Sequence, residues 1–394
     1  MSTTEFVLRS GESWRDPFPM YRDLRDHDPV HHVPAGDSHG GFWFLSRFAD
    51  VFDAARDTGT FSSARGLTVE PGTGVDMGEA TPIVFLDPPD HTAFRRLVGP
   101  GFTPRQVSDI EDDVRDFVVE RLERLVSEGG GDIVADLFKP LPSFVVAHYL
   151  GVQAEDRPLF DRWTEQIVAA AAQGRTDDPG SGIGDLLGYF GRLIERRRTD
   201  PGDDMVSQLV ALGEDAVSIL WVLGFAFTMV AGGNDTTTGM LGGSAVLLTE
   251  NYGERRRLLD DPGLIPNAVE ELLRLTSPVQ NLARTTTRDV DVGRKSIPAG
   301  ARVLLGYGSA NRDEREYGVN AEYLDVSRPV ERMLAFGSGA HFCLGAAVAR
   351  LQARVALEEL LGRCPEFTVD GASGTYATGN YVRRHAGLPF KVTA

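Results

Sequence analysis

The chain has 394 residues, 42% of them hydrophobic and 25% charged, so it can bury the core of a large globular protein. Its formal net charge of −17 argues against a nucleic-acid partner, because binding to a phosphate backbone requires a basic surface. Two cysteines exclude a disulfide framework, and a reducing compartment, the cytoplasm, is expected.

The N-terminal segment carries no recognisable targeting signal. Residues 1–14 lack the basic segment followed by an apolar run that marks a signal peptide. The longest apolar stretch, 219–231, is shorter than the roughly 20 residues that cross a bilayer. We therefore expect no membrane anchor, and we interpret this stretch as a buried helix.

The first two thirds of the chain are predicted to be mostly helical. Residues 17–26 have the pattern of a short amphipathic helix, and strands are predicted at 30–33 and 42–45. From residue 47 to about residue 275 the pattern is nearly all helical. Clusters of Gly, Pro and Asp predict breaks in this region at 129–131, 177–184 and 201–204.

The last third mixes short strands, loops and one long helix. Residues 290–308 alternate Val and Ile around a turn at 297–300, which predicts a small sheet. An irregular region extends to residue 338, and a helix is predicted from 344 to about 364. Since no repeat or change of composition divides the chain, we predict one domain over residues 1–394, mainly α with a minor β part.

The most informative segment surrounds Cys343 and begins at Phe336 with the sequence FGSGAHFCLG. The cysteine precedes a predicted helix, whose unpaired N–H groups and dipole lower the pKa of a thiol. Gly337, Gly339 and Gly345 allow the backbone to lie close against a flat ligand, where a Cβ would collide. A lone cysteine is commonly a structural residue, but this setting favours a thiolate that binds a metal.

Two further patterns are open to two interpretations each. Glu271 and Arg274 share one helix face, which alone is typical of a solvated surface pair. Residues 231–237 read AGGNDTT, and Gly and hydroxyl residues are poor helix interior. Either a helix ends there, or it opens locally where Thr side chains and water replace backbone hydrogen bonds.

These three segments together resemble the cytochrome P-450 superfamily, which is marked by Phe-x-x-Gly-x-x-x-Cys-x-Gly, Glu-x-x-Arg and Gly-x-Asp-Thr-Thr. The resemblance covers almost the full length and implies the cytochrome P-450 fold with haem b as cofactor. It implies a monooxygenase that activates dioxygen and inserts one oxygen atom into a small apolar organic substrate. The stretches that look like the actinobacterial cytochrome P-450 family 130 are Phe61–Thr68, Thr228–Asp235, Gly239–Gly243 and Tyr381–Arg384.

The resemblance also assigns roles to individual residues. Cys343 would be the axial ligand of the haem iron, and its thiolate would favour cleavage of the O–O bond. Asp235 and Thr236 would be the acid–alcohol pair that delivers protons for that cleavage. Glu271 and Arg274 would form a buried structural trio with a third residue, Arg328, which holds the cysteine loop to the core.

The same resemblance predicts the walls of the cofactor and substrate sites. Haem propionates need cationic or hydrogen-bond donor partners, and the matching residues are His91, Arg95, Arg284 and His341. Phe336, Gly337 and Gly345 would complete the haem contacts. The substrate pocket is expected to be lined by Val230, Ala231, Gly232, Val279, Leu282, Ala283, Asn380 and Val382.

The chain also lacks a fused flavin domain, so it looks like the class that receives electrons from NAD(P)H through a separate ferredoxin reductase and ferredoxin. An acidic ferredoxin would need a basic patch, and the candidates are Arg96, Arg105, Arg332, Arg350 and Arg354. Ordinary surface salt bridges are the alternative for each of them. Two other functions stay open, a peroxygenase driven by hydrogen peroxide and a haem sensor or carrier without turnover. The intact Asp235–Thr236 pair argues against both.

Overall fold

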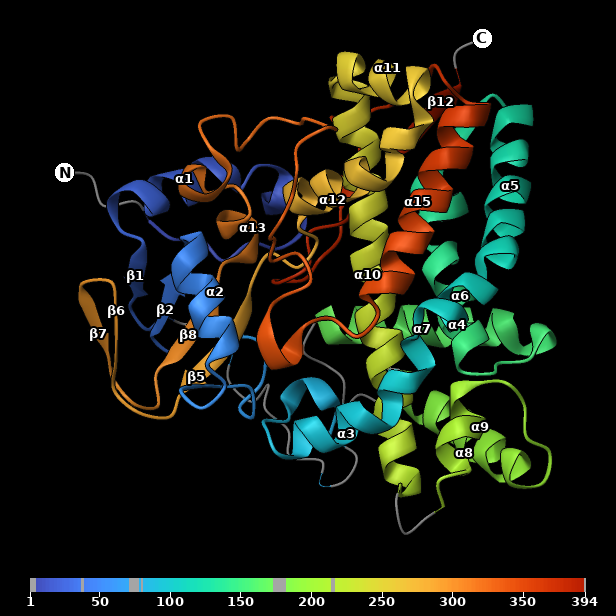
Figure 1. The fold of residues 1–394 in the computed structure, drawn as a ribbon, viewed down its shortest axis with the longest axis horizontal. Helices are drawn as coiled ribbons and strands as arrows, with labels where there is room; N and C mark the ends of the chain where they lie inside the picture. Colours follow the sequence, from blue (N-terminus) through green and yellow to red (C-terminus); the bar gives the residue numbers. More distant parts are fainter. Residues whose placement is uncertain are drawn as a thin grey trace.

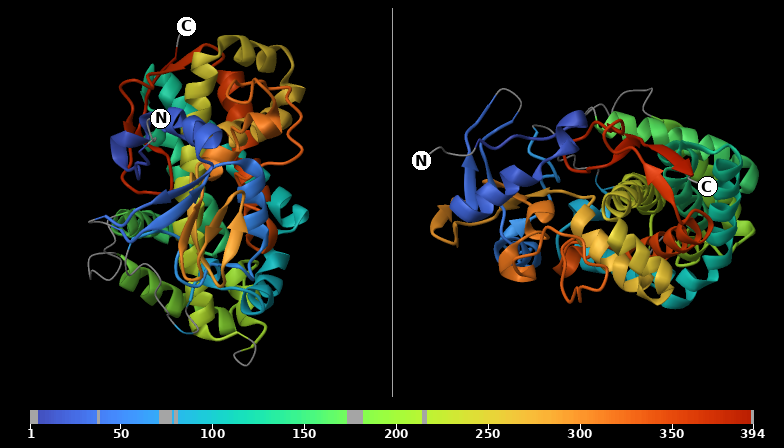
Figure 2. Two further views of the ribbon diagram at one scale, coloured as in Figure 1. Left: turned by 90° about the vertical axis from the view of Figure 1, so that its left-hand side faces the viewer. Right: turned by 90° about the horizontal axis from the view of Figure 1, so that it is seen from above.

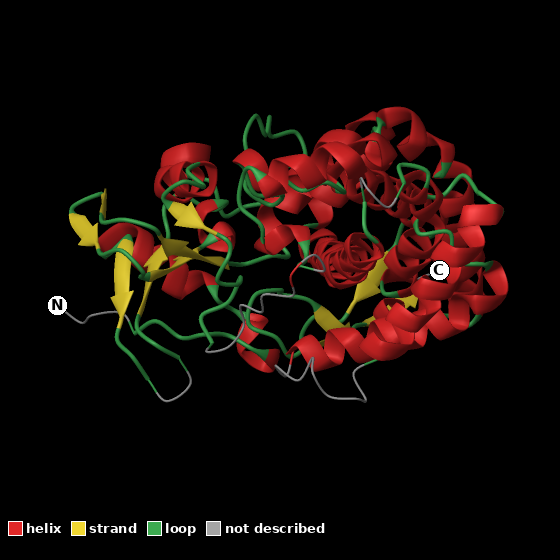
Figure 3. Cartoon of the chain, turned by 90° about the horizontal axis from the view of Figure 1, so that it is seen from below, coloured by secondary structure: helices red, strands yellow, loops and turns green. Residues whose placement is uncertain are grey.

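Helices and sheets occupy opposite sides of the molecule. The computed structural model describes residues 5–36, 39–70, 78, 81–172, 182–213 and 217–392. Helices α5 to α10 and α15 lie on one side, and the strands β1, β2, β5 and β8 lie on the other (Figures 1 and 2). Colouring by secondary structure shows the same predominance of helix over strand (Figure 3).

The α-helices are α1 (Phe18–His27), α2 (Phe48–Arg56), α3 (Asp90–Val98), α4 (Pro104–Asp109), α5 (Glu111–Ser127), α6 (Pro140–Tyr149), α7 (Arg157–Ala172), α8 (Ile183–Thr199), α9 (Met205–Val210), α10 (Ile219–Glu250), α11 (Tyr252–Asp260), α12 (Ile265–Thr276), α13 (Tyr307–Ala310), α14 (Glu314–Tyr317) and α15 (Ala346–Arg363). Short 3-10 turns are η1 (Gly11–Arg15), η3 (Ile83–Phe85), η4 (Gly99–Phe102), η6 (Ala154–Asp156), η7 (Pro262–Leu264) and η8 (Gly339–His341), and η5 (Val134–Phe138) is a π-turn.

The strands are β1 (Val30–Val33), β2 (Phe42–Leu45), β3 (Phe61–Ser62), β4 (Gly130–Asp132), β5 (Leu282–Thr286), β6 (Val290–Val292), β7 (Lys295–Ile297), β8 (Arg302–Leu305), β9 (Phe367–Val369), β10 (Thr375–Tyr376), β11 (His385–Gly387) and β12 (Pro389–Val392). The largest sheet has the order β1-β2-β8-β5-β3, in which β2 and β8 are parallel. Both predicted N-terminal strands are confirmed at their predicted bounds.

Sequence reasoning missed the short strands β3 and β4 in the region predicted to be helical. Each has two or three residues, and each is held by a partner far away in the sequence, β5 for β3 and β12 for β4. Such strands have no periodicity of their own to detect. Of the predicted break at 177–184, positions 177–181 lie outside the described residues.

Helix α10 passes through the middle of the helical side and is seen end-on with other helices around it in the right-hand view of Figure 2. It runs unbroken from Ile219 to Glu250, so the interpretation of residues 231–237 as a helix end is wrong. Polar side chains are tolerated there because they donate hydrogen bonds to backbone carbonyl groups of the same helix. The Asn234 amide and the Thr236 hydroxyl each donate to the carbonyl four residues earlier, both at 2.9 Å.

Helix α15 follows the cysteine loop and packs against α5, α10 and α12. It begins at Ala346, two residues later than predicted, with Gly345 as its N-cap. Gly345 therefore lies before the first turn of the helix and not within it. Cys343 is consequently part of the loop that leads into the N-terminal end of α15.

Candidate functional site

The loop before α15 is a closed turn that depends on glycine. The Cys343 amide donates to the Phe336 carbonyl at 2.9 Å, and Gly337 and Gly339 have φ of +67° and +71°. A Cβ on Gly339 would lie 2.9 Å from Arg56 Cα, so this glycine packs against α2 and not against a ligand. In contrast, a Cβ on Gly345 would meet nothing within 4 Å, which leaves room for a ligand there.

Cys343 keeps accessible surface in the loop before α15, which leaves this residue open to a ligand. Burial raises the pKa of the thiol, whereas the Gly345 amide, Arg95 and Arg350 act to lower it. The net direction is the opposite of the one we predicted from the helix terminus. Burial outweighs the local donors, so an iron ion, to which a coordinating thiol binds as thiolate, would be needed to keep the sulfur deprotonated.

The four predicted propionate partners do come together. The rings of His91 and His341 lie 4.2 Å apart between centroids, and Arg95 donates to the Ala340 carbonyl at 3.2 Å. The pKa of His341 is lowered to about 3, first by burial and then by the nearby Arg284, His91 and Arg95. The four side chains thus form one cluster beside the cysteine loop. Its positive charge comes from the two arginines, because the lowered pKa values of the two histidines favour neutral imidazoles.

Among the described residues, neither arginine of this cluster forms an ion pair with a carboxylate. Arg284 is 3% exposed and donates to the neighbouring Ala283 carbonyl at 2.8 Å. His91 is 2% exposed, and its Nδ1 is buried without a hydrogen-bond partner. Asp87 is the carboxylate near His91, and it accepts hydrogen bonds from the Ser62 hydroxyl and the Ser63 amide.

Sequence reasoning missed a further member of this group, Arg302 on β8. Its pKa is lowered to about 10 by burial and by the positive charges of Arg65 and Arg284, against a smaller opposing effect of Glu70. No motif marks Arg302, because only the pairing of β8 with β5 brings it to Arg284. The neighbouring arginines, and the His91 nitrogen that has no hydrogen-bond partner in the described part of the chain, fit the two carboxylates of a haem.

The predicted structural trio is present as a buried ion network. Arg274 binds Glu271 through two nitrogens, both at 2.7 Å, and Arg328 Nε donates to Glu271 Oε1 at 3.0 Å. Glu271 and Arg274 are 0% exposed and Arg328 is 8% exposed. The interpretation of Glu271 and Arg274 as a solvated surface pair is therefore wrong.

The acid–alcohol candidates are adjacent residues of α10, and Asp235 has a partner that we did not predict. Arg384 Nε lies 2.8 Å from Asp235 Oδ1. Burial raises the pKa of Asp235, whereas Arg384 and then Lys139 act to lower it. A Cβ on Gly239 would lie 2.7 Å from the Arg383 carbonyl, so a glycine one turn after Asp235 lets this segment approach the helix.

The predicted substrate wall is only partly accessible. Val230 and Ala283 are 0% exposed and pack within hydrophobic cores. Val382 is nearly buried and forms a β-bridge with Val279. The residues that retain accessible surface are Ala231, Gly232, Val279, Leu282 and Asn380.

Most of the predicted basic patch is neutralised. Arg332 pairs with Glu316 at 2.8 Å, Arg350 with Glu270 at 2.6 Å and Arg354 with Glu111 at 2.6 Å. Arg96 and Arg105 are exposed. For the three paired arginines the alternative of ordinary salt bridges is confirmed.

Within the described ranges, we find no helix with the length and apolarity that a bilayer crossing requires.

Comparison with known proteins agrees with the geometry. The family model described as Cytochrome P450 matches residues 260–372. The chain is 59% identical to Cytochrome P450 130 of Mycobacterium tuberculosis, over 99% of this chain and 98% of that protein. It is 36% identical to the vitamin D(3) 25-hydroxylase of Pseudonocardia autotrophica, over 93% and 91% of the two chains. The structure of cytochrome P450 CYP109Q5 from Chondromyces apiculatus superposes with a TM-score of 0.88 at 33% identity, covering 97% of each chain.

Proposed function

Because the chain belongs to the cytochrome P450 family of haem monooxygenases, we propose that it inserts one oxygen atom of dioxygen into a small apolar organic substrate, with electrons passed from NAD(P)H by a ferredoxin reductase and a ferredoxin. The observation that carries this proposal is Cys343, which keeps accessible surface in the loop before α15, near two arginines that form no ion pair among the described residues. The whole chain would act as one domain in the cytoplasm, in keeping with its two free cysteines.

Each residue would contact the part of the haem that its position allows. When bound, haem would supply the iron at which dioxygen is activated. Cys343 would hold that iron, and His91, Arg95, Arg284 and His341 would bind the propionates. Phe336 and the space beside Gly337 and Gly345 would form the proximal wall.

Proton delivery would fall to Asp235 and Thr236. The Thr236 hydroxyl donates to the Gly232 carbonyl, so its oxygen lone pairs are left to accept a hydrogen bond from a water molecule that carries the proton. Arg384 holds Asp235 Oδ1, which would leave Oδ2 to exchange protons. Since burial raises the pKa of Asp235 and Arg384 opposes the rise, this carboxyl group would titrate nearer neutral pH than a free carboxylate.

An apolar substrate is supported by the residues on the accessible wall, which are mostly small or aliphatic, such as Ala231, Gly232 and Leu282. A relative named for hydroxylation of vitamin D(3) points in the same direction. The exposed Arg96 and Arg105 would contribute to docking of an acidic ferredoxin.

The test combines a spectrum with turnover. The reduced holoprotein with carbon monoxide should show the long-wavelength Soret band of a thiolate ligand, and Cys343→His should lose it. With a surrogate ferredoxin and reductase, NADPH and oxygen consumption should accompany product formation from an apolar library. Product formed from hydrogen peroxide alone at an equal rate would favour a peroxygenase, and haem binding without any turnover would favour a sensor or carrier.

A further inference from the structure

A cavity of about 340 Å³ lies beside the C-terminal half of α10, away from the cysteine loop. Its walls come from η1, α10, α12 and the segments around β10 and β11, so it joins the N-terminal segment to the C-terminal sheet. Three arginines line it, Arg15, Arg312 and Arg383. None of the residues assigned to the cofactor or to proton delivery belongs to its lining.

Two of these arginines lack a counter-ion. Arg312 is 7% exposed, lies 3.7 Å above the Phe18 ring and donates to the Leu275 carbonyl at 2.9 Å. Arg383 donates to the Trp14 carbonyl at 2.7 Å and to the Tyr376 hydroxyl at 2.8 Å. In the described part of the chain, neither guanidinium has a carboxylate oxygen within 4 Å.

The neighbouring positive charges lower the pKa values of two groups that line the cavity. Burial lowers the pKa of Arg312 to about 9, and Arg383 is the next largest cause. His385, 2% exposed, also lines the cavity, and its pKa is lowered to about 4 by burial, Arg383 and Arg15. A buried cation without a partner is costly, so this site is stabilised by any anion that the cavity admits.

Among the described residues, nearby carboxylates meet this demand only in part. Glu322 acts to raise the pKa of Arg312, but it is already paired with Arg22 and Arg25. Asp16 and Glu250 also line the cavity, but both are exposed, and Arg15 is already paired with Glu12 at 2.6 Å.

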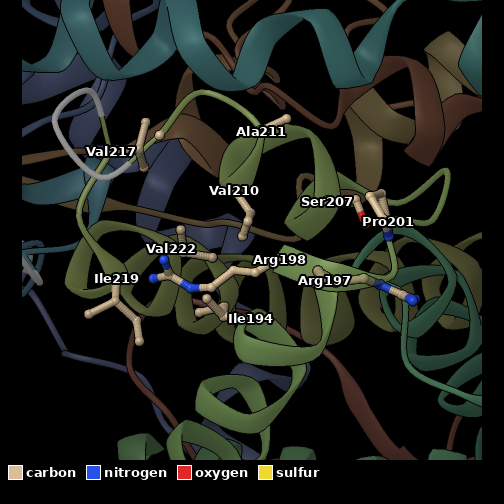
Figure 4. Close-up of a pocket in the computed structure, with 11 residues that line it drawn as sticks. Ile194, Arg197, Arg198, Pro201, Ser207, Val210, Ala211, Val217, Ile219 and Val222 are labelled. Atoms are coloured by element: carbon tan, nitrogen blue, oxygen red, sulfur yellow. The ribbon is translucent and has the colours of Figure 1, made fainter.

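A second cavity of about 200 Å³, lined by residues of α8, α9 and α10, provides a contrast (Figure 4). It also contains two arginines among apolar side chains, and Figure 4 shows Arg198 extending toward Ile219. There, however, Arg197 pairs with Asp204 at 2.8 Å and Arg198 with Glu195 at 3.3 Å. Because both arginines are paired with carboxylates, this second cavity does not require an anionic ligand.

We propose that the cavity beside α10 binds a small organic carboxylate, whose negative charge lies between Arg312 and Arg383 and whose short apolar body contacts Val246, Leu247 and Leu275. Guanidinium groups suit a carboxylate because their planar forks match its two oxygens. The aliphatic side chains of the same wall would cover a hydrocarbon portion that inorganic phosphate lacks.

The experiment titrates the holoprotein with sodium hexanoate and follows Tm and binding heat, with the haem side of the protein blocked by a saturating azole. We expect saturable stabilisation by hexanoate, little effect of the neutral hexanamide, and weaker binding of inorganic phosphate. Arg383→Gln should weaken hexanoate binding at least tenfold, and Arg383→Lys should restore part of it. Arg198→Gln, in the cavity of Figure 4, should leave binding unchanged.

Two further measurements keep the inference falsifiable if Arg383→Gln folds poorly. Val246→Phe narrows the cavity without changing its charge and should also abolish binding, and crystals soaked in 6-bromohexanoate should show the bromine beside α10. Equal binding of hexanamide, or bromine density only elsewhere, would overturn the site. Phosphate binding as tight as hexanoate would overturn the carboxylate assignment. None of these outcomes depends on monooxygenase turnover.

Discussion

Arg328→Met tests whether the ion network around Glu271 stabilises the cysteine loop. Glu271 is fully buried and shared between two arginines, and Arg328 is the one that comes from the loop region before Cys343. Its guanidinium also donates to the Tyr317 carbonyl at 3.0 Å and to the Asn320 carbonyl at 2.9 Å. Methionine keeps the length of the side chain and removes all these bonds together.

The expected loss follows from burial. Removing one partner from a buried ion network costs about 3–5 kcal/mol. A chain of 394 residues has an unfolding entropy of about 0.8 kcal/mol/K, so this loss corresponds to a decrease in Tm of about 4–6 °C. Since Arg274 still binds Glu271 through two nitrogens, the variant should fold.

The structure offers a matched control in Glu322, a second carboxylate shared by two arginines. There Arg22 is 53% exposed, while Arg25 is buried. Because an exposed pair contributes at most about 1 kcal/mol, Arg22→Met should lower Tm by about 1 °C. Thermal unfolding of both holoproteins by calorimetry, together with the rate of haem transfer to apomyoglobin, measures the difference. Equal shifts in the two variants would refute the argument.

Thr236→Ala should leave haem binding intact while more of the NADPH consumed appears as hydrogen peroxide, because the hydroxyl no longer passes on a proton; unchanged coupling to product would contradict this role. Arg384→Gln removes the charge that lowers the pKa of Asp235, so this pKa should rise, and the pH profile of coupled turnover should move to higher pH, whereas Arg384→Lys should stay near the wild type. The folded-state pKa of His385 is about 4, against about 6.5 when unfolded, so its contribution of about 3 kcal/mol is complete above pH 6.5 and is lost as the pH falls toward 4. His385→Gln should therefore flatten the decrease in Tm between pH 7 and pH 4.5. An unchanged slope would show that His385 does not contribute to the pH dependence of stability.

The sequence alone determined the features that depend on neighbours along the chain. The strands β1 and β2 and the helix α1 follow from local periodicity, and Glu271 and Arg274 share a face because a helix brings residues three apart together. The turn that presents Cys343 is likewise encoded locally, since Gly337 and Gly339 supply the positive φ values that other residues avoid.

Burial and charge pairing were decided only by the tertiary structure. The burial of Val230 and Ala283 in hydrophobic cores could not be predicted from sequence, because which face of a helix or strand is covered depends on what packs on it. Arg384 reaches Asp235 because β11 and the segment before it lie against α10 at Gly239. The pKa of Cys343 moved opposite to the local expectation, since the free energy of removing a charge from water depends on the whole surrounding protein, whereas a helix terminus acts only over its first turn.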